Sequence, residues 1–115
     1  MAFSYSISDS SGVKVVHLAG NLLDKPQALP MLEEVAEFME DGHVNFVLSM
    51  TDFQYINSTG LNVLINILTK ARKAGGEAII TAVPAKIKEL LLITKLNMVF
   101  TVTETLDEAL VKLNR

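Results

Sequence analysis

The chain has 115 residues, a formal net charge of −3, no cysteine and two histidines, and half of its residues are apolar. This length fits one domain, residues 1–115, whose single core buries roughly two thirds of the surface of the unfolded chain. Without cysteine the chain has no disulfide, thiol nucleophile or thiolate metal site. His17 and His43 are too far apart in sequence to pair at metal-ligand spacing.

The basic residues and the apolar runs narrow the class of protein further. The ten lysines and arginines are scattered apart from a trio at 70, 72 and 73, so the chain lacks the concentrated basic face that binds nucleic acid. No apolar run approaches the about 18 residues of a membrane span. The first residues lack the positive leader and apolar segment of a signal peptide. We therefore expect a cytoplasmic protein that does not insert into a membrane.

The first 20 residues predict two strands. Phe3, Tyr5 and Ile7 alternate with serines, which is typical of an edge strand with one buried face and one wet face. After the turn signal at residues 9–12, residues 13–20 are nearly apolar, as an interior strand is. The short connection makes the two strands an antiparallel hairpin.

The rest of the chain alternates helices with strands. The pattern first predicts a loop at 21–25, a helix from Met31 with an acidic outer face, a strand at 44–48 and a loop at 49–55. A helix follows from near Ser58 to the Gly75-Gly76 stop, and then a strand at 77–83. The last elements are a helix from Pro84 to about Thr94, a strand at 99–102, and a helix from Leu106 to about Leu113 that is capped by Thr105. This order predicts an α/β fold with a mixed, mostly parallel sheet of four to five strands, an N-terminal antiparallel hairpin and about four helices.

No catalytic motif is present. The sequence contains no G-x-G-x-x-G, no phosphate-binding loop and no G-x-S-x-G. Both histidines have structural explanations, so a serine nucleophile has no obvious base. We expect no catalytic residue, no enzymatic activity, no cofactor and no metal.

Ser58 stands at the edge of an α/β sheet where functional groups collect, between the end of a strand and the start of a helix. One interpretation is that its hydroxyl caps the helix, which stabilises the fold by about 1 kcal/mol. The other is that the hydroxyl is a modification site, and Asn57 is then a competing cap. Phe53 and Tyr55 precede it, and we expect them at an interface.

Residues 47–64 (VLSMTDFQYINSTGLNVL), the Gly75-Gly76 turn and the strand EAIITAV resemble the STAS domain of bacterial anti-sigma factor antagonists. The signature of that family is a strand, a short loop and Asp-Ser-Ser-Gly-Leu. The segment from Gly20 to Asp24 resembles the family's Gly-x-Leu-Asp loop with one residue more, and the likeness spans essentially the whole chain. Asn57 and Ser49 stand where the family commonly has aspartate.

The resemblance implies a STAS-like fold and regulation of transcription by partner switching. The unmodified protein captures an anti-sigma factor that is also a serine kinase of the GHKL type, and phosphorylation ends the capture. The phosphorylated serine of the family corresponds to Ser58, with Thr59 as the alternative. The partner contacts expected here are Asp24, Phe53, Tyr55, Asn57, Ser58, Thr59 and Gly60.

Two other functions remain open at this point. One is a STAS-like docking subunit of a membrane transport complex, which is not phosphorylated. The other is a small-ligand carrier, although no polar cluster in an apolar run indicates a pocket. The sequence leaves the oligomeric state open.

Overall fold

In the computed structural model, which describes residues 2–114, β1 (Ser4–Ser10) and β2 (Val13–Leu22) form the predicted antiparallel hairpin. The register runs from Ser4 opposite Ala19 to Ser10 opposite Val13. The serines at 4, 6 and 8 are exposed, and the apolar side chains at 3, 5 and 7 pack against the core. β1 is an edge strand, as its alternating pattern predicts.

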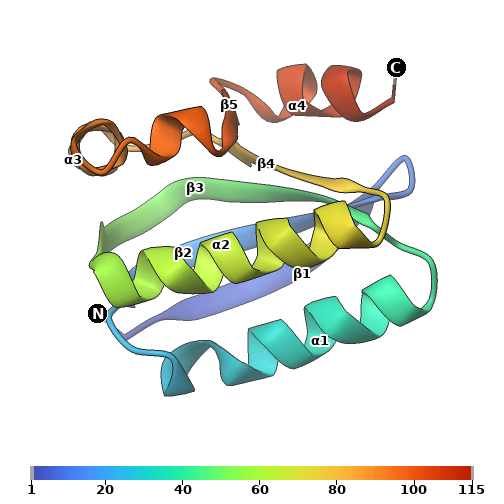
Figure 1. The fold of residues 1–115 in the computed structure, drawn as a ribbon, viewed down its shortest axis with the longest axis horizontal. Helices are drawn as coiled ribbons and strands as arrows, with labels where there is room; N and C mark the ends of the chain where they lie inside the picture. Colours follow the sequence, from blue (N-terminus) through green and yellow to red (C-terminus); the bar gives the residue numbers. More distant parts are fainter. Residues whose placement is uncertain (1, 115) are drawn as a thin grey trace.

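The remaining elements follow in the predicted order (Figure 1). They are η1 (Pro26–Ala28), α1 (Leu29–Glu40), β3 (Asn45–Ile56), α2 (Ser58–Lys73), β4 (Glu77–Thr81), α3 (Ala85–Ile93), η2 (Leu96–Met98), β5 (Thr101–Thr103) and α4 (Leu106–Leu113). The five strands lie in the order β1-β2-β3-β4-β5, and every pair after the first is parallel. The predicted α/β fold with a mixed, mostly parallel sheet is confirmed.

Helices cover both faces of the sheet because alternate residues of the buried strands point to opposite sides. Phe46 and Leu48 of β3 belong to the larger core, together with the buried side chains of α1, α2 and α3. Val47, between them, belongs to a smaller core that includes Ala109 of α4. Figure 1 shows α1 and α2 on one side of the strands and α4 on the other.

β3 is longer than the sequence predicts. The expected loop at 49–55 is wrong, because the strand continues to Ile56 alongside β2, which itself continues to Leu22. The register with β2 shifts twice, and each shift places one extra residue in β3, as a β-bulge does. The two bulges make the buried residues recur every third position, at 50, 53 and 56. Because the buried residues do not alternate with exposed ones, this part of the sequence lacks the two-residue period that predicts a strand.

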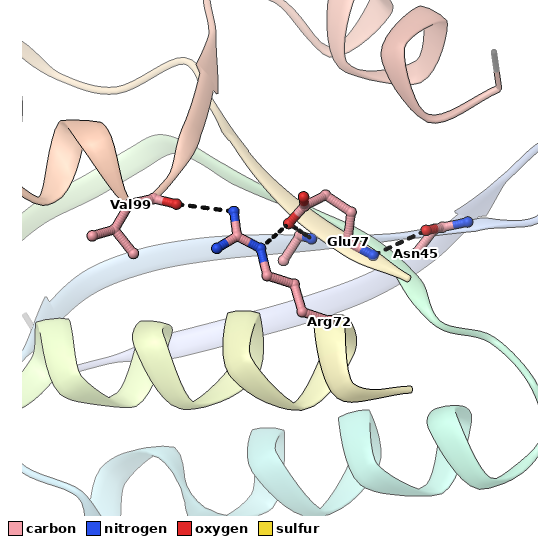
Figure 2. A network of polar contacts seen from close by, with 5 residues as sticks. Asn45, Arg72, Glu77 and Val99 are labelled. Atoms are coloured by element: carbon pink, nitrogen blue, oxygen red, sulfur yellow. Dashed lines mark hydrogen bonds and ion pairs between the residues drawn. The ribbon is translucent and has the colours of Figure 1, made fainter. Parts of the chain in front are cut away.

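The far end of α2 is joined to the sheet by Arg72 (Figure 2). Its Nε donates to Glu77 Oε1 at 3.0 Å, and its Nη2 donates to the carbonyl oxygen of Val99 at 3.0 Å. The backbone N–H of Glu77 donates to Asn45 Oδ1 at 3.1 Å. The ion pair is partly exposed and stabilises by no more than about 1 kcal/mol. Its contribution is to connect α2 with the starts of β3 and β4 and the segment before β5.

Candidate functional site

The start of α2 is capped by Asn57. Its backbone is extended, with φ −106° and ψ −175°, and its Oδ1 accepts a hydrogen bond from the backbone N–H of Gly60 at 2.9 Å. The helix begins at the next residue, Ser58. Since Asn57 occupies the capping position, the interpretation of Ser58 as the helix cap is wrong.

The same side chain joins α2 to a distant part of the chain. Asn57 Nδ2 donates to the carbonyl oxygen of Leu23, the residue that follows β2, at 2.9 Å. The amide group therefore accepts with one atom and donates with the other. A carboxylate at this position accepts from Gly60 but has no proton to donate to Leu23. This accounts for asparagine at a position where the family resemblance leads us to expect aspartate.

Ser58 is a surface residue in the first turn of α2. The residue is exposed, and within residues 2–114 its Oγ makes no hydrogen bond. The first turn of α2 contains no acidic residue. The unpaired N–H groups of a helix start give it a partial positive charge, so a negative group on Ser58 is tolerated there.

Thr59 is also exposed, but it lines a different hollow. Consecutive helical residues point about 100° apart. Ser58 lines a hollow of about 460 Å³ between the end of β3 and α3. Thr59 lines a separate hollow of about 240 Å³ between α1 and α2, which also contains Lys25 and Leu32. The structure thus separates two hydroxyls that are neighbours in sequence.

Two of the other expected contacts are exposed. The side chain of Tyr55 is 55% exposed at the end of β3. Asp24 is exposed in the connection after β2, where its Oδ1 accepts from the backbone N–H of Gln27 at 3.0 Å. Both residues lie close to the start of α2. Tyr55 is near the end of β3, which leads directly into α2, and the connection that contains Asp24 is joined to α2 by the hydrogen bond from Asn57 to Leu23.

Phe53 is a core residue, and the expectation that it is an exposed contact is wrong. It is only 3% exposed, and its ring lies 6.2 Å from that of Phe3, centroid to centroid. The first bulge in β3 turns this residue inward, three positions after the buried Met50. Of the two aromatic residues before Ser58, only Tyr55 is placed to touch a partner.

Gly60 is buried and serves packing. A Cβ atom at this position would lie 2.5 Å from the carbonyl oxygen of Leu22 and 2.6 Å from Ile56 Cγ1. The absence of a side chain lets the first turn of α2 approach the ends of β2 and β3. Gly60 therefore holds the neighbouring Ser58 and Thr59 in place but does not itself reach the surface.

The structure also brings residues to Ser58 that the sequence did not indicate. Lys86, Glu89 and Ile93 of α3 line the same hollow. Their spacing marks one face of a helix, but nothing in the pattern places that face beside the start of α2. Within residues 2–114, no cluster of three or more His, Asp or Glu could hold a metal ion, and no helix is long and apolar enough to cross a membrane.

This arrangement, with an exposed hydroxyl at a helix start at the edge of a mixed sheet, agrees with the family that the chain matches. Residues 5–109 match the STAS domain family, and the chain belongs to it. A relative in Thermotoga neapolitana, named "Putative anti-sigma factor antagonist TM1081 homolog", is 30% identical over 74 residues. The match covers 64% of this chain and 66% of that relative.

Solved structures with the same fold include proteins of similar description. A crystal structure of a "putative anti-sigma factor antagonist" from Thermotoga maritima superposes with a TM-score of 0.81 at 23% identity, over 98% of this chain and 95% of that one. The Bacillus cell fate determinant SpoIIAA in its phosphorylated form has a TM-score of 0.73 at 13% identity, over 95% and 98% of the two chains. At these identities the likeness establishes the fold.

Proposed function

We propose that this chain is an anti-sigma factor antagonist, which binds an anti-sigma factor and so releases a sigma factor. Its membership of the STAS domain family and the descriptions of its relatives support this function. The partner is an anti-sigma factor with serine kinase activity of the GHKL type, and phosphorylation of Ser58 ends the binding.

The observation that carries this proposal is the unbonded, exposed hydroxyl of Ser58 beside the capping Asn57. In the transfer, Ser58 Oγ attacks the γ-phosphorus of ATP bound to the kinase. The new O–P bond forms while the bond from that phosphorus to the bridging oxygen of ADP breaks, and the hydroxyl proton passes to a base of the kinase or to water. This chain supplies only the acceptor, so it needs no catalytic residue of its own.

Phosphorylation acts on the interface with the partner and leaves the fold intact. The phosphate carries a charge of about −1.5 to −2 at pH 7. At the start of α2 the helix dipole favours this charge, and no carboxylate of the first turn opposes it. In a packed interface an uncompensated charge costs about 3–5 kcal/mol. This cost corresponds to a loss of affinity on the order of 100-fold or more.

The proposed contact surface surrounds the start of α2. It comprises the exposed side chains of Asp24, Tyr55, Ser58 and Thr59, with the half-buried Asn57 at its centre. Tyr55 supplies a large amphipathic ring of the kind that is enriched at interface hot spots.

The test uses the purified chain and the anti-sigma factors of its source organism. One of them should bind the unmodified chain in titration calorimetry and bind the Ser58-phosphorylated chain at least about 100-fold more weakly. With labelled ATP, Ser58→Ala should lose phosphate incorporation, and the matched variant Thr59→Ala should keep it. Label that persists in Ser58→Ala, or that mass spectrometry maps to Thr59, would refute the assignment of the switch. Capture of a transporter ATPase with no anti-sigma factor bound would favour a docking subunit instead.

A further inference from the structure

The hollow beside Ser58 has apolar walls and one cation. β3 contributes Tyr55, and α3 contributes Leu90 and Ile93, whose side chains line the space. Tyr55 is 55% exposed and Ile93 is 78% exposed, so both side chains are accessible to another molecule. Figure 1 shows the end of β3, the start of α2 and α3 together at one end of the molecule.

Lys86, in the first turn of α3, is the basic residue of this hollow. Among residues 2–114 the ion pairs are Lys14 with Asp9 and Arg72 with Glu77, and Lys86 takes part in neither. Glu89 lines the same space. The hollow therefore holds one positive and one negative group, and a phosphate on Ser58 would add up to two negative charges to it.

We propose that Lys86 binds the phosphate of modified Ser58 and holds it across the mouth of this hollow, so that Tyr55 and Ile93 become inaccessible to the partner. This inference rests on the proposed phosphorylation of Ser58. Modification then weakens binding in two ways, because the interface gains a charge and the partner loses an apolar contact. The effect is specific to Ser58, since Thr59 lines the other hollow, where Lys25 is the basic residue.

The pairing can be measured without any partner protein. The full chain is made with phosphoserine installed at position 58 during translation, and its phosphate is titrated by ³¹P NMR. The second pKa of a phosphoserine is about 6. A cation in contact favours the dianion and lowers this pKa. Lys86→Gln should therefore raise the phosphate pKa by about 0.5 relative to the parent.

Two variants of the same helix serve as controls. Lys88→Gln removes the same charge from a position of α3 that does not line the hollow, and it should leave the phosphate pKa nearly unchanged. Glu89→Gln removes the negative group of the hollow and should lower that pKa. Identical titrations of the parent and Lys86→Gln, or an equal shift in Lys88→Gln, would overturn the pairing.

Closure of the hollow has its own readout. The nitration rate of Tyr55, measured by mass spectrometry on its peptide, should fall several-fold on phosphorylation of the parent. It should not fall in the phosphorylated Lys86→Gln variant, and an equal fall in both would overturn the closure. Because no anti-sigma factor is present, these results do not depend on the proposed partner. The two proposals can therefore fail separately. If no kinase labels Ser58 but the phosphate pKa still depends on Lys86, the proposed function is refuted, whereas the contact between Lys86 and the phosphate is confirmed.

Discussion

Replacing Asn57 with alanine should destabilise the fold by about 2 kcal/mol. The variant loses the cap on the backbone N–H of Gly60, which stabilises by about 1 kcal/mol. It also loses the 2.9 Å hydrogen bond to the carbonyl oxygen of Leu23, which contributes about 1 kcal/mol at a half-buried site. In urea denaturation the midpoint should fall without a change in slope. In a chain of this size the melting temperature should fall by about 8 °C.

Two further substitutions separate the cap from the bond to Leu23. Asn57→Ser keeps only the cap and should cost about 1 kcal/mol. Asn57→Asp also keeps the cap and gains about 0.3–1 kcal/mol from its charge at the helix start. However, it loses the donor and places a carboxylate beside the Leu23 carbonyl, so its net cost should be close to 1 kcal/mol. An Asn57→Ser protein as stable as the parent would show that the amide donor contributes nothing.

Gly60→Ala should destabilise the fold by more than about 2 kcal/mol in urea denaturation, because its Cβ meets backbone and core atoms at 2.5–2.6 Å; a wild-type midpoint would contradict this. Phe53→Ala should cost about 3–5 kcal/mol, whereas Tyr55→Ala should stay within about 0.5 kcal/mol of the parent, and similar costs for both would refute the assignment of their burial. Partial burial, then the hydrogen bond to Glu34, raise the pKa of Tyr5 to about 12. The unfolded chain therefore loses the Tyr5 proton at a lower pH than the folded chain. The contribution of Tyr5 to the free energy of unfolding is fully present below pH 10 and is lost as the pH rises toward 12. In a Tyr55→Phe protein, where Tyr5 is the sole tyrosine, the tyrosinate absorbance should have its midpoint near pH 12, and a midpoint near pH 10 would argue against the contact.

Most of the fold follows from local sequence patterns. The serine alternation at the start of the chain, the apolar stripe of α2 and the cap at Thr105, whose Oγ1 accepts from the backbone N–H of Glu108 at 3.2 Å, are all found where the sequence predicts them. These features depend on residues within one or two turns of each other, and so the sequence displays them directly.

The errors concern contacts between distant residues. The sequence predicts a loop for the second half of β3, because two bulges replace the alternation by a three-residue spacing that only the pairing with β2 explains. The same bulges bury Phe53, for which the sequence predicts a place at an interface. The sequence also left two candidates for the helix cap. Asn57 is the cap in the structure, and its side chain also donates a hydrogen bond to Leu23. This second bond depends on the position of the residue that follows β2, which the local sequence does not reveal.

The composition and periodicity of the chain are enough to specify a sheet of mostly parallel strands with a serine at the start of its central helix. The tertiary structure decides what surrounds that serine. It places Ser58 beside α3 and Thr59 beside α1, because a helix turns its successive residues toward different neighbours. Which neighbours those are depends on how the helices pack on the sheet, and no local pattern contains that information.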